Sequence, residues 1–222
     1  MTQNQFVLPG DVIVTGDYRP EQNVILEGNR LMSTAIGFSE IKDDLVTVTP
    51  LTGLYTPKTD DLIIGKIVSH NALSWVVDIN SYYSGILTAS DIFGKDYSAS
   101  RDDLSLKLNT CDIILARIAN VGSRDPLLTI IGEKLGKIDS GELVKISPAK
   151  IPRLLGKHKS MIQSIETSTN ATITVGQNGF IILKCDDSAG LQKAIASIKM
   201  IGMTHDDANI EEKIQNILDE NN

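Results

Sequence analysis

The sequence predicts a mainly β protein that ends in an α/β domain. Short β-type runs separated by turn-forming residues extend from Phe6 to about Tyr55. Five further β-rich runs follow between residues 62 and 131. After Gly141 the apolar residues change from the alternation typical of strands to the spacing of amphipathic helices. These three observations divide the chain into a β module, a second β domain and an α/β domain.

Residues 1–56 are predicted to form a small β module. Turn formers such as Pro9-Gly10-Asp11 and Lys42-Asp43-Asp44 separate short apolar runs. The expected strands lie at residues 12–14, 24–26, 31–36 and 45–48. Pro57 and the acidic pair Asp60-Asp61 then interrupt the apolar pattern, so we place the domain boundary there.

Residues 57–138 match the pattern of a five-stranded Greek-key barrel of the OB type. Such a barrel consists of short strands joined by loops of uneven length. The predicted strands are residues 62–68, 75–79, 85–87, 113–118 and 127–131, with a longer polar insertion near residues 94–109. Residues 100–104 fit a single capped helical turn within that insertion. Part of a β-sandwich is the alternative.

Residues 139–203 combine strands with helices, and residues 204–222 are predicted as a separate acidic helix. Ser160 and Gln163 form a capping-box pattern, and Met161, Ile162 and Ile165 share one helical face. The turn Gly176-Gln177-Asn178-Gly179 predicts a hairpin, because Asn-Gly suits the positive φ of a two-residue turn. The expected strands are residues 143–146, 172–175 and 180–183, with helices from Ile151 and over residues 189–203.

The 222 residues carry a formal net charge of −7, but the charge is unevenly distributed. Residues 147–183 hold four basic side chains and one acidic side chain, so only this segment attracts polyanions by charge alone.

Cys111 and Cys185 are far apart, which predicts buried thiols in a reducing compartment rather than a disulfide. No apolar run approaches the roughly 18 residues of a membrane span. A cytoplasmic location without membrane association is therefore expected.

No catalytic or cofactor-binding motif is present in the sequence. Neither phosphate-binding glycine loop nor the HExxH metal motif occurs, and the three histidines are dispersed. Acidic pairs such as Asp102-Asp103 and Asp186-Asp187 fall in predicted turns or at helix starts, where aspartate serves as a cap. We therefore predict no catalytic residues, no metal site and no cofactor for the isolated chain.

The segment Gly156-Lys157-His158-Lys159 precedes a helix and is a candidate RNA contact. In KH domains a GxxG loop joins two helices and lets the backbone approach nucleic-acid phosphates. Here Lys159 replaces the second glycine, while Lys157, His158 and Lys159 supply positive charge. A loop retained for packing without RNA contact is the alternative.

The barrel supplies a second set of candidate RNA-binding residues. Bases stack on exposed aromatic rings in OB folds, and one of Tyr82 and Tyr83 is expected to be exposed. Trp75 alternates with other apolar residues, which favours a place in the core. The nearby cations that are candidates for phosphate contact are Lys66, Lys95, Arg101, Arg117 and Arg124.

Several motifs together resemble the KH-containing cap subunit of the RNA exosome in its short archaeal form. The turn 176–179, a G-x-N-G sequence, is the most specific of them because ordinary KH domains lack it. The other matching segments are Pro9-Gly10-Asp11, Tyr18-Arg19-Pro20, residues 61–67, residues 75–79, and residues 127–130 through Gly136. The resemblance covers about residues 6–203.

This resemblance implies a non-catalytic, RNA-binding subunit. In that family three cap proteins sit on a ring of RNase PH-like subunits, the N-terminal β domain docks on the ring, and the barrel lines the pore that admits single-stranded RNA. The ring then degrades the RNA from 3′ to 5′. Other exosome cap proteins are possible additional partners, and Lys159 departs from the family's GxxG form.

Two other classes of protein remain as alternatives. Transcription or translation factors also combine OB and KH modules, although the elongation factors of that kind carry two KH units and this chain has room for one. Polynucleotide phosphorylase has the modules in the opposite order, after catalytic domains that are missing here. A structural adaptor without RNA contact is the second alternative.

Overall fold

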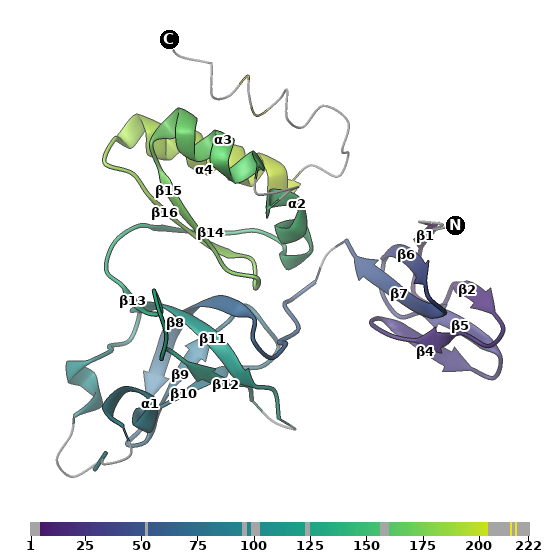
Figure 1. Cartoon of the computed structure of the whole chain (residues 1–222), viewed down its shortest axis with the longest axis horizontal. Helices are drawn as coiled ribbons and strands as arrows, with labels where there is room; N and C mark the ends of the chain where they lie inside the picture. Colours follow the sequence, from purple (N-terminus) through teal and green to yellow (C-terminus); the bar gives the residue numbers. More distant parts are fainter. Residues whose placement is uncertain are drawn as a thin grey trace. The chain divides into compact units, whose positions relative to one another are not determined.

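The computed structural model describes residues 5–51, 53–94, 97–98, 103–122, 125–155, 160–203, 214 and 216. It contains two compact units, one that ends at Gly53 and one that begins at Leu54 (Figure 1). In the described part of the chain, no helix has both the length and the apolar character needed to cross a membrane. The same residues do not bring three metal-ligating side chains together.

The first unit consists of two small sheets around one apolar core. The first sheet has the order β1-β6-β7-β3 and the second has the order β2-β5-β4. The core is formed by Val7, Val24, Leu31, Val46 and Val48. The strands are β1 (Gln5–Val7), β2 (Val12–Thr15), β3 (Arg19–Pro20), β4 (Val24–Glu27), β5 (Arg30–Ser33), β6 (Gly37–Lys42) and β7 (Leu45–Pro50).

The expectation of a single strand over residues 31–36 is wrong. Strand β5 ends at Ser33, whose hydroxyl bonds to the carbonyl of Ala35, and β6 then begins at Gly37. Gly37 packs so tightly on β7 that a Cβ atom would lie 2.1 Å from the Thr49 carbonyl oxygen. The two buried residues of β6 are Gly37, which has no side chain, and the small residue Ser39, whereas Phe38 is 44% exposed. An apolar pattern therefore could not locate this strand.

The second unit begins with a closed five-stranded barrel, which confirms the predicted OB fold and excludes the β-sandwich. The strands have the order β12-β10-β9-β8-β11, and β12 also pairs with β11 to close the barrel. Among the described strand pairs of the barrel, the β10–β12 pair is parallel and the others are antiparallel. The strands are β8 (Leu62–His70), β9 (Ser74–Asp78), β10 (Gly85–Thr88), β11 (Ile113–Asn120) and β12 (Leu127–Thr129). Trp75 is fully buried in the barrel, which confirms its core position.

Short elements decorate the barrel. Helix α1 (Ala89–Phe93) follows β10, and the insertion contains a 3-10 turn, η1 (Leu104–Leu106). Asp103 caps that turn by accepting a 2.9 Å hydrogen bond from the Ser105 N–H, and the Ser105 bonds lower the pKa of Asp103. Strand β13 (Gly136–Ile138) pairs with β11 and was not expected from its sequence. The observed 3-10 turn begins at the last residue of the predicted turn, residues 100–104, and residues 100–102 lie outside the described residues.

The C-terminal part of the second unit has the predicted α/β pattern, with its helices on one face of a three-stranded sheet (Figure 1). The strand order is β14-β16-β15. Ile162 and Ile165 are buried in the core between helices and sheet. The elements are β14 (Glu142–Lys145), η2 (Pro148–Lys150), α2 (Ile151–Leu155), α3 (Ser160–Thr169), β15 (Thr172–Val175), β16 (Phe180–Lys184) and α4 (Ser188–Met203).

Three details differ from, or add to, the expectations for this region. The β15–β16 loop has four residues rather than two, and within it only Gly179 has a positive φ, +85°. Cys111 is exposed in a tight turn and Cys185 is partly buried, so the expectation of two buried thiols is wrong for Cys111. Ile214 is helical and buried against the α/β core, whereas most of the predicted acidic helix lies outside the described residues.

Candidate nucleic-acid interface

The hairpin turn between β15 and β16 fastens the α/β domain to the barrel. Strand β9 pairs with β8 only from Lys66 onward, which leaves one edge of residues 62–64 without a strand partner. Gln177 covers part of this edge: its N–H donates to the Leu62 carbonyl at 2.8 Å, and its Oε1 accepts from the Leu62 N–H at 2.7 Å. The turn thus replaces a missing strand.

Asn178, whose side chain is fully buried, extends this contact into the barrel. Its Nδ2 group donates to the carbonyls of Ile64 (2.7 Å) and Ile79 (2.9 Å), and its Oδ1 accepts from the Ile64 N–H. The Asn80 side chain donates back to the Asn178 carbonyl at 2.6 Å. At Gly176 a Cβ atom would lie 2.4 Å from Asn178 Oδ1, so the turn requires glycine there. The G-x-N-G sequence therefore joins the two domains.

An apolar cluster reinforces this junction. Ile64 and Leu115 on the outer face of β8 and β11 pack against Phe180 and Ile182 of β16. Buried apolar contacts of this kind oppose rotation of one domain against the other. The partly buried side chains around the cluster are Leu62, Ile113, Leu135, Ile138 and Leu143.

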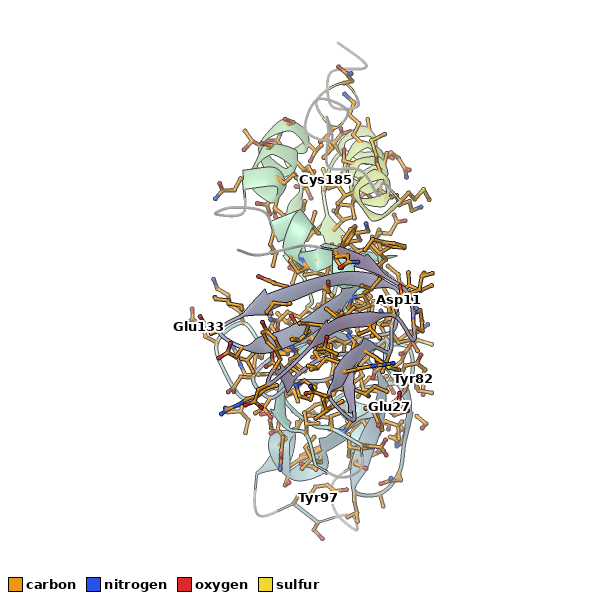
Figure 2. All side chains as sticks on the ribbon, turned by 90° about the vertical axis from the view of Figure 1, so that its right-hand side faces the viewer. Asp11, Glu27, Tyr82, Tyr97, Glu133 and Cys185 are labelled. Atoms are coloured by element: carbon orange, nitrogen blue, oxygen red, sulfur yellow. The ribbon has the colours of Figure 1, made fainter. Side chains whose placement is uncertain are left out.

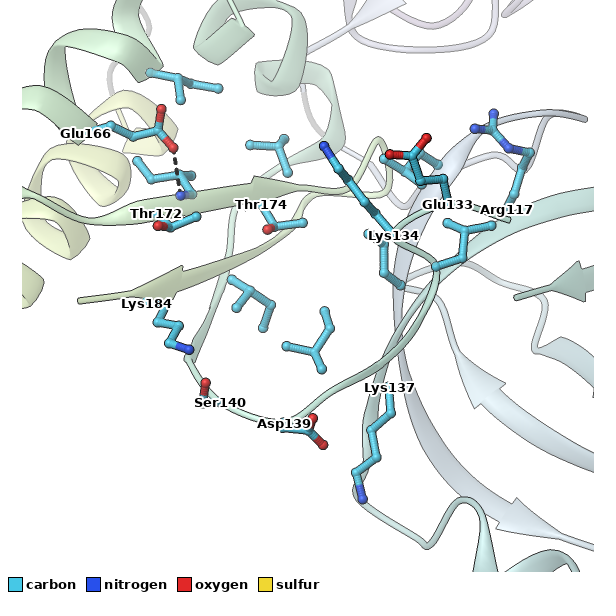
Figure 3. Close-up of a pocket in the computed structure, with 18 of the residues that line it drawn as sticks. Arg117, Glu133, Lys134, Lys137, Asp139, Ser140, Glu166, Thr172, Thr174 and Lys184 are labelled. Atoms are coloured by element: carbon cyan, nitrogen blue, oxygen red, sulfur yellow. Dashed lines mark hydrogen bonds between the residues drawn. The ribbon is translucent and has the colours of Figure 1, made fainter. Parts of the chain in front are cut away.

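A groove of about 750 Å³ lies beside this junction, with one wall from the barrel and one from the α/β domain (Figure 3). Leu62, Leu115 and the segment 133–140 form the barrel wall. Helices α2 and α3 and the strands β15 and β16 form the other wall. Its charged residues are Arg117, Lys134, Lys137 and Lys184, together with Glu133, Asp139 and Glu166.

Some of these charged side chains already have partners within the protein, and others remain available to a ligand. Lys137 pairs with Asp112 at 2.8 Å. Desolvation alone would raise the pKa of Asp112. Hydrogen bonds from the Asn109 N–H and from Lys137 outweigh this effect, so the pKa of Asp112 is lowered. Glu166 accepts a 2.8 Å bond from the Ile173 N–H. Lys134 and Lys184 are exposed and make no ion pair with any other described residue.

The structure separates the described candidates of the barrel into two groups. Lys66 and Arg117 lie on the outer face of β8 and β11, but only Arg117 lines the groove, where it donates to the Asp60 carbonyl at 2.7 Å. Tyr82 and Tyr83 project from the β9–β10 loop and are 82% and 53% exposed, and Figure 2 shows Tyr82 at the molecular surface. We expected one exposed tyrosine, and both are exposed.

The remaining predicted contacts lie outside the described residues. They are Lys95, Arg101, Arg124, Gly156, Lys157, His158 and Lys159. Because α2 ends at Leu155 and α3 begins at Ser160, the segment 156–159 does join two helices. Lys134 and Lys184 could not be predicted as groove residues from the sequence, because the packed junction of the two domains places them on one groove.

Comparisons with known proteins identify a domain family for part of the chain and relatives along nearly its whole length. The KH domain family matches residues 141–189. The exosome complex component Rrp4 of Nitrosopumilus maritimus is 53% identical over 98% of this chain and 96% of its own length. The Rrp4 component of Thermosphaera aggregans is 33% identical over 99% of this chain and 92% of its own length.

A solved structure also has the same fold. It is a crystal structure described as that of an exosome complex RNA-binding protein, and it superposes with a TM-score of 0.73 at 36% sequence identity. The match covers 76% of this chain and 97% of the other. With the barrel, the KH domain and the joining turn in place, these similarities show that the chain belongs to the Rrp4 family of exosome complex components.

Proposed function

We propose that this protein is a non-catalytic, RNA-binding cap subunit of a cytoplasmic exosome. In this proposal it guides single-stranded RNA to the pore of an RNase PH-like ring that degrades RNA from 3′ to 5′. The observation that carries the proposal is the similarity to Rrp4 exosome components along nearly the whole chain. A barrel fastened to a single KH domain is consistent with it, because both modules bind single-stranded nucleic acid in many proteins.

The first unit is the proposed ring-docking domain. Residues 1–53 carry seven acidic and three basic side chains. Phe6 and Phe38 form an edge-to-face pair with ring centres 5.9 Å apart, and both rings are about half exposed. Exposed apolar side chains on so small a unit are typical of protein contact sites. Ile25 and Leu26 are exposed to a similar extent.

The barrel is the proposed site of RNA capture. Tyr82 and Tyr83 offer two exposed rings, and base stacking on such rings contributes about 1–3 kcal/mol per base without sequence preference. With a net charge of −7, binding by the free chain is expected to be weak and to fall steeply with salt.

Charge reversal tests whether the barrel or the KH loop contributes more to RNA binding. We expect the triple change of Arg101, Arg117 and Arg124 to Glu to weaken RNA capture by the assembled complex more than the double change of Lys157 and Lys159 to Glu. The reason is that the barrel lines the pore in this proposal, and a pore needs only electrostatic attraction to guide a single strand. RNA affinity at two salt concentrations measures both effects. A larger loss from the lysine pair, with tighter binding by Lys159→Gly, would contradict this prediction.

The purified chain is expected to leave RNA intact. Labelled single-stranded RNA incubated with the chain, with or without phosphate and Mg²⁺, should show no shortening, because the sequence carries no catalytic motif. The RNase PH-like ring assayed alongside is the positive control. Processive 3′ to 5′ degradation by the pure chain would overturn the non-catalytic assignment.

A further inference from the structure

We infer that the groove between the barrel and the KH domain is a binding subsite for one or two nucleotides of unpaired RNA. Lys134 of the barrel wall and Lys184 of the KH wall would bind phosphates, and the apolar floor would receive the bases. This inference rests on the proposed function and refines it. A volume of about 750 Å³ lies within the range of small-molecule pockets and is far too small for a duplex.

The floor of the groove suits flat, apolar base surfaces. Leu62 and Leu115 contribute from the barrel, and Leu155, Ile162 and Val175 contribute from the KH domain. Because the floor combines side chains from both domains, it depends on the junction that Asn178 holds. The subsite is therefore a property of the joined domains rather than of either one.

Strand β15 supplies polar groups for base edges along one side of the groove. It is the outermost strand of its sheet, so one of its two edges has no strand partner. The Ile173 N–H points away from β16 and donates to Glu166, which shows the outward direction of alternate backbone groups. By this alternation the Val175 N–H faces the same way. The hydroxyl residues Thr172 and Thr174 also line the groove.

The groove lining carries four basic and three acidic side chains, and two of its lysines are placed to contact the phosphates of a nucleotide. Figure 3 shows Lys134 reaching from the barrel side toward the KH strands, with Lys184 on the opposite wall. Both are exposed, and neither pairs with another described residue. Of the three acidic groups, Glu166 is engaged by the Ile173 N–H. Glu133 and Asp139 remain at the rim and would limit the affinity.

The test combines charge variants of the full-length chain with direct localisation of the RNA. The probe is a fluorescein-labelled, single-stranded oligoribonucleotide of mixed sequence. The double variant Lys134→Glu/Lys184→Glu should bind it about tenfold or more weakly, with a shallower salt dependence. The control Lys42→Glu/Lys199→Glu changes net charge equally at exposed lysines that do not line the groove. The variant Glu133→Gln/Asp139→Asn should bind more tightly, an effect that damage to the fold does not produce.

Methyl NMR of the isoleucine-labelled chain locates the RNA. On titration with the oligoribonucleotide, the methyl groups of Ile138, Ile162 and Ile173 should shift, whereas Ile25 in the first unit should not. Wild-type binding that leaves these methyl groups unmoved, with equal losses in both lysine variants, would overturn the subsite and leave the proposed function standing. Absence of RNA binding by the wild type would contradict the proposed function itself. Shifts caused by a ring subunit but not by RNA would assign the groove to a protein partner and also overturn the subsite.

Discussion

Replacement of Asn178 by alanine is expected to lower the free energy of unfolding of the full chain by about 2–4 kcal/mol. The substitution removes the side-chain partners of the Ile64 N–H and of the Ile64 and Ile79 carbonyls at a buried site. Each buried polar group left without a partner costs about 1–3 kcal/mol, and partial entry of water reduces the sum. Urea unfolding followed by circular dichroism measures the loss.

A matched surface change provides the control. Asn120→Ala makes the same chemical change at an exposed position near the end of β11, and it should alter stability by less than about 0.5 kcal/mol. The variant Asn178→Asp retains an acceptor but loses both Nδ2 bonds and buries a charge, so it should be at least as damaging as alanine. Wild-type stability in both Asn178 variants would show that the turn does not fasten the domains.

Removal of residues 1–53 is expected to abolish association with the RNase PH-like ring while residues 54–222 still melt cooperatively. The cut belongs after Gly53, where the two compact units divide. Co-elution with the purified ring on size-exclusion chromatography measures association, and thermal melting measures folding. Undiminished ring binding by this truncated chain would contradict the docking role of the first unit.

Removal of residues 1–56 is the comparison for the removal of residues 1–53. Tyr55 is buried, its N–H donates to the Asn80 carbonyl at 3.0 Å, and its hydroxyl donates to Asp61. Burial and the Asp61 contact raise the pKa of Tyr55 well above its ordinary value, so this hydroxyl stays protonated. Removal of residues 1–56 should therefore cost about 3 kcal/mol more stability than removal of residues 1–53.

The sequence predicts the barrel and the KH domain well because their strands and helices bury large apolar side chains at regular spacing. Strand β8 and helix α3 are the clearest cases, with Ile63, Ile67, Ile162 and Ile165 all buried. Strands β6 and β13 lack this signal. The buried residues of β6 are Gly37 and Ser39, and β13 is a three-residue Gly-Lys-Ile strand that pairs with the edge of β11.

The candidate site is less predictable, because it depends on contacts between distant segments. Lys134 and Lys184 are fifty positions apart in the sequence and line the same groove only because the domains pack together. Asn178 illustrates a second difficulty. The Asn-Gly sequence predicts a turn because of the backbone conformation that these residues favour. Asn178, however, stabilises the junction through its buried side-chain amide, which donates hydrogen bonds to residues more than ninety positions away. A pattern of neighbouring residues in the sequence cannot predict a hydrogen bond of this kind.

Reconstitution with the ring is the decisive experiment for the proposed role as a cap subunit. The full chain is mixed with purified RNase PH-like subunits, and co-elution, RNA affinity and phosphorolysis are measured with and without the chain. We expect the chain to join the ring, to tighten RNA binding in a salt-dependent manner and to speed 3′ to 5′ degradation by the ring. A chain that neither joins the ring nor changes the affinity of the ring for single-stranded RNA would show that the protein is not such a cap subunit.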